Sequence, residues 1–479
     1  MTFPERIPTE IVQLFSSAEA WNYQLVPYAR RDGAVLCAGE RERDYASVSQ
    51  EIEVLSGFRV QIEPVGPDEL SRLLNRYYRR EEARPVSGRT ADLSRIGSGQ
   101  GFLTELIGEA FDEYASDIHF EPYEERCRIR LRIDGKLVEK YVIDSGNYAS
   151  LVNQIKIMAN LDISERRLPQ DGRILYHRGE RKFDLRVSSL PTIYGEKVVL
   201  RLLTRHAELL ELSNLGFSER QLADYAEAIS RPHGMALITG PTGSGKSTTL
   251  YATLRRLNRE SGNILTIEDP VEYTLEGVNQ VQLKEEIGLT FGAALRTFLR
   301  QDPDIIMLGE IRDADTAAMA IRSSLTGHLV FSTIHTNSAW GSVSRLRDMG
   351  VHPYLLSGTL ILCAAQRLIR LLCPDCKKES ELTESEREQV YGKGASVPDR
   401  PHYRPVGCER CHYTGYRGRR AIYEVIPIDG ELAEAVRESR SDIAPLLKRR
   451  GITTLKDSAL DLFLSGQTSL EEVLPLLAE

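Results

Sequence analysis

The chain has 479 residues, which at roughly 100–200 residues per domain predicts two to four domains and excludes a single small module. Hydrophobic residues make up 41% and charged residues 27%, so a disordered or fibrous class is excluded for most of the length. The formal net charge of −8 opposes binding to nucleic acid or anionic lipid through charge alone. Seven cysteines are too few for a disulfide scaffold, and the start of the sequence lacks the features of a signal peptide. We therefore expect a cytosolic, reduced protein.

The first 80 residues predict a small domain that ends in a helix. Near its end, apolar side chains recur along one helical face at Leu70, Leu73, Leu74 and Tyr77. Residues 81–101 have few large apolar groups and contain the run Gly-Ser-Gly-Gln-Gly, so we interpret them as a linker. The longest run without Asp, Glu, Lys or Arg, residues 323–344, contains two histidines and many Ser and Thr, so no membrane-spanning helix is predicted.

Residues 102–204 predict an α+β domain. Apolar residues alternate with arginines from Arg126 to Ile133, which is the pattern of a half-buried strand. Asp134-Gly135 then predicts a hairpin turn, because both turn residues need positive φ. A helix is expected near residues 151–159, and further strands near 183–187 and 197–203. Residues 205–215 are predicted to be a second linker.

From residue 216 the pattern becomes an alternation of strands and helices. Short apolar runs, typical of strands buried on both faces, occur at residues 235–239, 263–267, 304–308 and 328–334. Helical patterns separate them, so residues 216–372 predict a doubly wound parallel sheet of the α/β class. A cysteine-bearing insert at 373–415 and a C-terminal helical region at 416–479 complete the expected organisation.

A glycine-rich loop follows the first of these buried strands and opens a helix. It consists of Gly240, Pro241, Thr242, Gly243, Ser244, Gly245, Lys246, Ser247 and Thr248. Glycines at these positions let backbone N–H groups cradle phosphate, Lys246 would hold the β- and γ-phosphates, and Ser247 would bind Mg²⁺. The alternative is a merely flexible Gly/Ser loop, which the flanking strand and helix disfavour. We expect ATP and Mg²⁺ here.

Three further side chains follow the buried strands. Glu310 ends an apolar strand and is the candidate to activate water, because glycine stands where many P-loop enzymes carry the metal-binding Asp. Glu268 belongs to a second acidic cluster at the same edge of the sheet. His335 follows the next strand and could sense the γ-phosphate. Taken singly, each carboxylate could be a solvated loop residue, and the histidine a structural hydrogen bonder.

Four cysteines form two Cys-x-x-Cys pairs, namely Cys373, Cys376, Cys408 and Cys411. In a reduced compartment, thiolates at this spacing predict a tetrahedral structural Zn²⁺ site. The alternative, two redox pairs, is disfavoured because neither pair lies on a thioredoxin-like unit.

Phosphoryl transfer also needs a cation opposite the phosphate loop. The α+β domain offers Arg173, Arg186 and Arg201, each of which could equally be an exposed sheet arginine.

Together these residues resemble the secretion ATPase superfamily, and specifically the type II secretion and type IV pilus assembly ATPases. The motifs that carry the resemblance are 116–119 (Ser-Asp-Ile-His), 168–173 (Leu-Pro-Gln-Asp-Gly-Arg), 240–248, 267–270, 300–304, 309–313, 335–337, the paired cysteines and 414–419. The resemblance implies a RecA-like ATPase domain with a zinc-binding insert, preceded by a PAS-like α+β domain. It places Glu268 in the family's "Asp box", Glu310 in the Walker B motif and His335 in the "His box". It also implies that Arg173 and Arg186 approach the nucleotide, with Arg201 a weaker match.

The resemblance further implies a homo-hexameric ring at the cytoplasmic face of an inner membrane, which it reaches through partner proteins. Residues 25–36 resemble the first domain of the type II secretion member, so residues 1–80 are expected to dock on the cytoplasmic domain of the inner-membrane L component. The polytopic F platform protein is a further expected partner. A type IV pilus assembly ATPase is the alternative within the family. A nucleic-acid translocase, disfavoured by the net charge, and a nucleotide-gated scaffold without turnover are alternatives of other classes.

Overall fold

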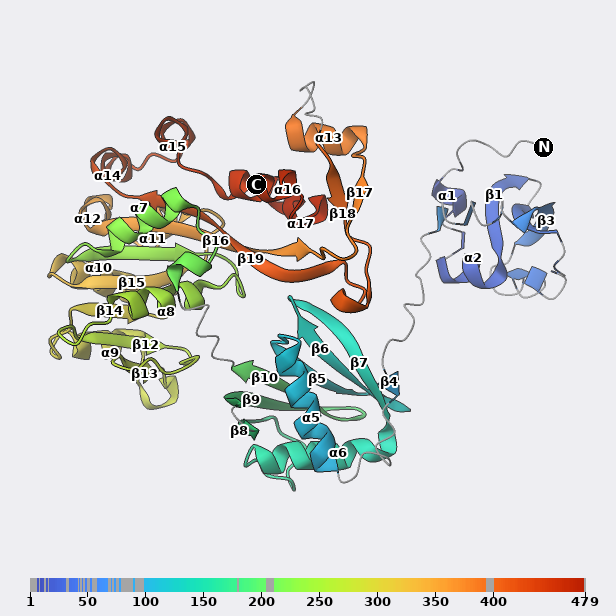
Figure 1. Ribbon diagram of the computed structural model, residues 1–479, viewed down its shortest axis with the longest axis horizontal. Helices are drawn as coiled ribbons and strands as arrows, with labels where there is room; N and C mark the ends of the chain where they lie inside the picture. Colours follow the sequence, from blue (N-terminus) through green and yellow to red (C-terminus); the bar gives the residue numbers. More distant parts are fainter. Residues whose placement is uncertain are drawn as a thin grey trace. The chain divides into compact units, whose positions relative to one another are not determined.

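A computed structural model describes residues 7–78 with short interruptions, 89–90, 99–178, 181–203, 211–392 and 400–477 (Figure 1). Residues Met1–Asp92 with Glu139–Asp144 form one compact unit, and Leu93–Val138 with Ser145–Glu479 form the other. Most residues of the two expected linkers lie outside the described residues. Within the described part of the chain, no helix is both long and apolar enough to cross a membrane.

The N-terminal unit contains a small three-stranded sheet in the order β1-β2-β3. The elements of this unit are α1 (Thr9–Val12), α2 (Ser17–Tyr23), β1 (Leu25–Arg31), β2 (Ala34–Glu40), β3 (Arg59–Val65) and the short β4 (Arg89–Thr90), which lies outside the three-stranded sheet. Strand β2 pairs antiparallel with β1 and parallel with β3. The helix expected at the end of this domain lies partly outside the described residues, although Leu70 and Leu74 are buried in its core.

The α+β domain is built on a sheet of antiparallel neighbours in the order β6-β5-β10-β9-β8. Its elements are α5 (Gly99–Asp112), β5 (Asp117–Pro122), β6 (Arg126–Ile133), the start of β7 (Lys136–Asp144), α6 (Ser145–Met158), β8 (Gln170–Arg178), β9 (Arg181–Thr192) and β10 (Gly195–Leu203). The part of β7 from Glu139 onward belongs to the N-terminal unit. The predicted turn between β6 and β7 is confirmed, since Asp134 and Gly135 have φ of 48° and 82°.

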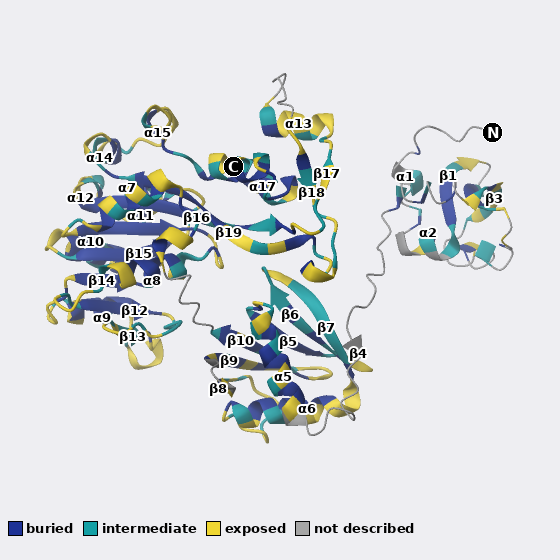
Figure 2. Ribbon diagram, viewed as in Figure 1, coloured by how far each residue is buried: buried dark blue, intermediate teal, exposed yellow. Residues whose placement is uncertain are grey.

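A seven-stranded sheet in the order β13-β12-β14-β15-β11-β16-β19 organises the rest of the chain. Its strands and flanking helices up to the insert are η2 (Leu212–Asn214), α7 (Glu219–Ile229), β11 (Gly234–Thr239), α8 (Lys246–Leu257), β12 (Ile264–Glu268), β13 (Asn279–Gln282), η3 (Glu285–Ile287), α9 (Phe291–Phe298), β14 (Ile305–Leu308), α10 (Ala314–Leu325), β15 (Leu329–Ile334), α11 (Gly341–Asp348), α12 (Pro353–Thr359) and β16 (Leu360–Leu372). Every residue of β11, β12, β14 and β15 is buried, and Figure 2 shows these central strands in dark blue. The expected α/β sheet is confirmed.

Parallel pairing brings the functional loops to one edge. Strands β12, β14, β15, β11 and β16 pair in parallel, with Thr239 opposite Ile334 and Ile267 opposite Leu308. The loops that leave the carboxyl ends of these strands therefore start side by side, at the edge where open α/β sheets bind ligands.

The cysteine insert lies between the two strands of a long antiparallel pair. Strand β16 pairs with β19 (Tyr416–Pro427), and the insert contains β17 (Lys378–Ser380), α13 (Glu384–Tyr391), β18 (His402–Arg404) and η4 (Glu409–Cys411). The C-terminal helices are α14 (Gly430–Arg437), α15 (Ala444–Arg450), α16 (Leu455–Leu464) and α17 (Leu470–Leu477). Residues 416–427, expected within a helical region, thus form a strand instead. Their run from Ala421 to Ile426 is buried, because it completes the central sheet.

Candidate nucleotide site and metal centre

The glycine-rich loop links the buried strand β11 to helix α8. Gly240, Gly243 and Gly245 have φ of 151°, 80° and 90°, in the region that favours glycine. A Cβ on Gly240 would lie 2.4 Å from the carbonyl oxygen of Gln366, so this position has no room for a side chain. Gly245 caps α8 without a side-chain hydrogen bond. No capping side chain therefore occupies the first N–H groups of α8, which leaves them for an anion.

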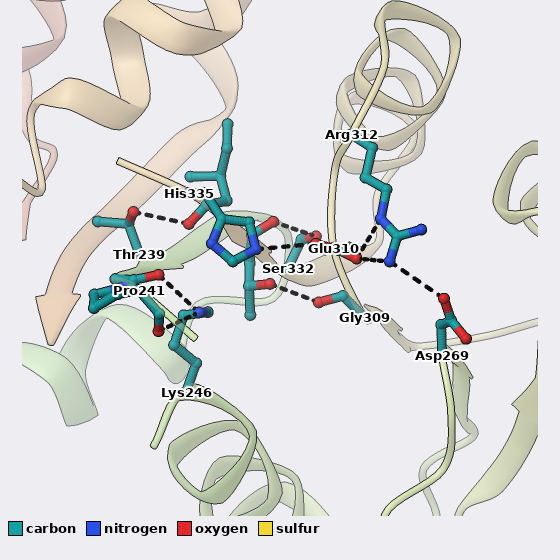
Figure 3. Close-up of polar contacts among 12 residues, drawn as sticks. Thr239, Pro241, Lys246, Asp269, Gly309, Glu310, Arg312, Ser332 and His335 are labelled. Carbon is teal, nitrogen blue, oxygen red and sulfur yellow. Dashed lines mark hydrogen bonds and ion pairs between the residues drawn. The ribbon is translucent and has the colours of Figure 1, made fainter. Parts of the chain in front are cut away.

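The side chain of Lys246 lies inside this loop. Its Nζ donates hydrogen bonds to the carbonyl oxygens of Gly240 at 2.8 Å and Pro241 at 3.1 Å, as Figure 3 shows. Burial lowers the pKa of Lys246 from its usual value, while the charge of Glu310 acts in the opposite direction. Among the described residues, the buried hydroxyl of Ser244 has no hydrogen-bond partner. A phosphate group would satisfy both the ammonium and this hydroxyl, so the loop fits the nucleotide predicted from the sequence.

Glu310 is held between a histidine and an arginine. Its Oε2 lies 3.1 Å from His335 Nε2, and its Oε1 accepts a hydrogen bond from Arg312 Nε (Figure 3). Arg312 also pairs with Asp269 at 3.2 Å, and these carboxylates, with Glu310 as the main cause, raise the pKa of Arg312. The structure thus brings two of the predicted residues together, Glu310 and His335. It adds Asp269 and Arg312, which lie within the motifs 267–270 and 309–313 but were not singled out as site residues.

Gly309, the residue before Glu310, lies close to the neighbouring strand β12. A Cβ on Gly309 would lie 3.3 Å from both the Cα of Glu268 and the carbonyl oxygen of Ile267. A side chain at this position would therefore require the backbone of β12 to shift by a few tenths of an ångström. The glycine noticed in the sequence suits the close packing of β14 on β12.

Glu268 lies at the end of β12 but turns away from the cluster around Glu310. Its carboxylate accepts hydrogen bonds from the Tyr251 hydroxyl, from Thr266 Oγ1 at 2.6 Å and from Gln280 Nε2 at 3.1 Å. Burial, together with the charge of Glu268, raises the pKa of Tyr251. The residue is 4% exposed and its two oxygens are already hydrogen-bonded. Its nucleotide role stays a prediction, because in this structure it is Asp269 that faces Arg312.

The candidate arginines lie at the loop between β12 and β13. Arg186 donates a hydrogen bond to the carbonyl oxygen of Val271, and its Nη1 lies 3.4 Å from Glu272 Oε2. Arg173, Arg186 and Arg201 together line a pocket of about 630 Å³ that also contains Pro270 and Gln282. Arg201 is paired with Asp117 at 2.8 Å, and this carboxylate raises the pKa of the guanidinium. The three arginines therefore share one pocket beside the acidic loop.

The four predicted cysteines form one cluster. Their sulfur atoms all lie within 4.8 Å of one another, with Cys373 and Cys408 at 3.9 Å and Cys376 and Cys411 at 3.8 Å. Zn–S bonds of about 2.3 Å in a tetrahedron put the sulfurs about 3.8 Å apart, so this geometry fits zinc. Backbone N–H groups of Gly407, Cys408 and Gly415 donate to the sulfurs of Cys376 and Cys411, and such hydrogen bonds stabilise the thiolate form that binds a metal.

The parallel sheet and the residues at its carboxyl edge define a RecA-like ATPase of the α/β class. Residues 96–475 match the model of the family described as Type II/IV secretion system protein. Type II secretion system protein E of Aeromonas hydrophila is 45% identical over 451 residues, which cover 90% of each chain. The type IV pilus assembly ATPase PilB of Myxococcus xanthus is 50% identical over 375 residues, which cover 77% of this chain and 66% of that protein.

A solved structure agrees with the sequence relatives. The pilus retraction motor PilT with bound ADP aligns with a TM-score of 0.53 at 26% identity, covering 77% of this chain and 95% of that one. The chain therefore belongs to the type II/IV secretion system protein family, and it is an ATPase. The resemblance drawn from the motifs and the fold class expected from it are confirmed.

If the cysteine cluster holds zinc, Cys376→Ser should lower the metal content from about one Zn²⁺ per chain to near zero, because one of four thiolates is lost. It should also lower the melting temperature, since the insert would lose its cross-link. Elemental analysis by mass spectrometry measures the metal, with Cys363→Ser as the control because that buried cysteine lies outside the cluster. The assignment would be contradicted if the purified wild-type protein contained no zinc.

Proposed function

We propose that this chain is the ATP-hydrolysing motor that drives pseudopilus assembly and protein export in a type II secretion system. The observation that carries the proposal is the Glu310–His335 pair, 3.1 Å apart. These residues follow β14 and β15, at the same edge of the sheet as the phosphate loop that follows β11. The relatives named type II secretion system protein E support the secretion role, since the Aeromonas hydrophila member matches along 90% of the chain.

The residues have distinct roles in the proposed P-loop mechanism. The loop amides and Lys246 hold the β- and γ-phosphates, and Ser247 would hold Mg²⁺, which neutralises charge developing on the phosphate oxygens. Glu310 takes a proton from the attacking water while the bond from the γ-phosphorus to the bridging oxygen breaks, giving ADP and phosphate. His335 orients Glu310 through their hydrogen bond and faces the γ-phosphate. Arg312 fixes the other carboxylate oxygen.

Arg186 supplies the cation in this proposal. Its contacts with Val271 and Glu272 keep it beside the acidic loop that follows β12. ATP binding would attract the guanidinium to the phosphates, and hydrolysis would release it. The α+β domain, with Arg173 on the adjacent strand β8, would thereby move against the ATPase domain once per turnover.

The assembly around the motor is also a proposal. We infer a homo-hexamer on the cytoplasmic face of the inner membrane, held there by the L component through residues 1–80 and by the F platform protein. A nucleic-acid translocase is disfavoured by the arginines of β6: Arg128 and Arg130 pair with Glu121 at 3.1 and 2.8 Å, and Arg132 lies 3.5 Å from Asp117. The guanidinium groups of these three arginines are thus already engaged by carboxylates of their own sheet.

Type IV pilus assembly is the second candidate function. The 50% identity to PilB of Myxococcus xanthus favours it, because this value exceeds the 45% to the type II relative. That match, however, covers 77% of this chain, whereas the type II match extends over 90%. The longer match supports the secretion role.

Glu310→Gln should retain ATP binding and lower turnover by about 100-fold or more, because the amide keeps the side-chain shape but cannot accept the proton. Lys246→Ala should instead lose nucleotide binding. Binding of a fluorescent ATP analogue and release of phosphate measure the two effects. Glu260→Gln, which changes an exposed glutamate in the loop after α8, serves as the control. Normal turnover in Glu310→Gln would refute its role as the base.

Arg186→Ala should lower turnover by about tenfold or more while ATP affinity changes little, since the guanidinium acts on charge that develops in the transition state. Arg126→Ala, which removes an exposed arginine of the same domain, is the matched control. Steady-state phosphate release over a range of ATP concentrations separates kcat from KM. If Arg186→Ala turned over ATP as fast as the control Arg126→Ala, Arg186 would have no part in hydrolysis.

Deleting residues 1–80 should abolish binding to the cytoplasmic domain of the L component while ATP binding persists, because the phosphate loop lies in the other unit. A pull-down with the full chain and the truncated chain tests this. The corresponding inner-membrane protein of a type IV pilus system is the comparison partner. Capture by the pilus protein alone would favour the second candidate function.

A further inference from the structure

The segment Thr336–Trp340 directly follows His335 and is attached to several parts of the ATPase domain. At its start, Thr336 N donates a hydrogen bond to the hydroxyl of Thr239 at 2.7 Å, which ties the segment to the last residue of β11. One residue on, the carbonyl oxygen of Asn337 accepts from Arg367 Nη2 at 2.9 Å. The half of the segment nearest His335 is therefore fixed to β11, the strand that leads into the phosphate loop, and to its neighbour β16.

The other half of the segment is attached to the C-terminal helices through a buried carboxylate. Glu424, on β19, accepts hydrogen bonds from Ala339 N at 2.8 Å and from Leu455 N at 3.3 Å. Leu455 is the first residue of helix α16, so one carboxylate serves both α16 and the segment before α11. Glu424 is 5% exposed and Ala339 is fully buried. Water is therefore a poor substitute for either hydrogen bond.

A second contact joins the same segment to the C-terminal region. Trp340 Nε1 donates to the carbonyl oxygen of Arg440 at 3.0 Å, and Arg347 Nη1 donates to that of Ser439 at 3.2 Å. Both acceptors lie in the connection between α14 and α15. The C-terminal helices thus hold the segment at two points, Ala339 and Trp340, within five residues of His335.

We propose that Glu424 is a positioning residue for ATP hydrolysis, which couples the place of His335 to helix α16 through Ala339. The proposal rests on the proposed function, because it gives His335 its role beside Glu310. A displacement of α16 would move Ala339 through the shared carboxylate. It would thereby change the distance from His335 to Glu310 and hence turnover. The C-terminal helices therefore act on the catalytic pair, in addition to covering the sheet.

Glu424→Gln tests the coupling at nearly constant volume. The amide keeps one oxygen acceptor and replaces the other with an NH₂ group, so either Ala339 N–H or Leu455 N–H loses its acceptor. We expect kcat for ATP to fall by about tenfold, with KM within about twofold of wild type, because the phosphate loop itself is unchanged. Trp340→Phe is the second variant, since it keeps a buried aromatic ring while removing the indole N–H donor and part of the ring volume. It should lower kcat by about threefold, and its effect should not add to that of Glu424→Gln.

Glu472→Gln is the matched control. Glu472 also attaches the C-terminal helices to the sheet, since it accepts from Arg370 N at 3.2 Å and from Arg370 Nη2 at 2.6 Å, with its side chain 17% exposed. Its partner lies on β16 and not in the segment after His335. A general loosening of the helices would affect both glutamate variants, whereas positioning of His335 would affect only Glu424→Gln. Kinetics are measured well below the melting temperature of each full-length variant.

A fall in kcat for Glu424→Gln, with Glu472→Gln at the wild-type value, supports the proposal. Wild-type kcat in Glu424→Gln would overturn it, and so would an equal loss in Glu472→Gln. His335→Ala, measured alongside, separates this test from that of the proposed function. If His335→Ala lowers turnover and Glu424→Gln does not, only the coupling fails. If His335→Ala turns over at the wild-type rate, the proposed role of His335 fails and the coupling with it.

Discussion

The parallel pairing of β11 with β15 is the constraint on which the candidate site depends. It places Thr239 opposite Ile334, so the phosphate loop and His335 leave neighbouring strands at the same level. The hydroxyl of Thr239 then bonds to the Thr336 backbone and secures this alignment. Strand β14 pairs with β15 on its other side and brings Glu310 to the same edge. The phosphate loop, Glu310 and His335 thus meet because the strands that precede them are parallel.

The carboxylates at this edge differ in their burial and in their hydrogen-bond partners. Glu268 is enclosed by hydroxyl and amide donors, so it is stabilised as part of the core between β12 and β13. Glu310 has half-exposed partners, a histidine and an arginine. In the proposed mechanism Glu310 takes a proton during turnover, and partners at the surface leave its carboxylate room to adjust. The buried Glu424 has a different proposed role. Its hydrogen bonds to Ala339 and Leu455 couple the position of α16 to that of His335, and it accepts no proton during turnover.

Local sequence patterns predicted much of this structure. The strand, glycine loop and helix around Lys246 and the four cysteines were predictable because each is defined by local spacing. Which of Glu268 and Asp269 contacts Arg312 was not, because adjacent residues at a strand end point to opposite faces and only the packed sheet decides which of them reaches the guanidinium. Strand β19 was missed because the insert separates it from β16, its partner. The contact of Arg186 with Glu272 joins two domains and leaves no local pattern.

The account rests on the claim that the loop around Lys246 exchanges its own carbonyl oxygens for nucleotide phosphate. A crystal structure of the full chain with Mg²⁺ and a non-hydrolysable ATP analogue tests this most directly. We predict that Lys246 Nζ leaves the carbonyl oxygens of Gly240 and Pro241 and contacts the β- and γ-phosphates, with Glu310 and His335 facing the γ-phosphate. Nucleotide bound elsewhere, with Lys246 still hydrogen-bonded to both carbonyl oxygens, would contradict the account.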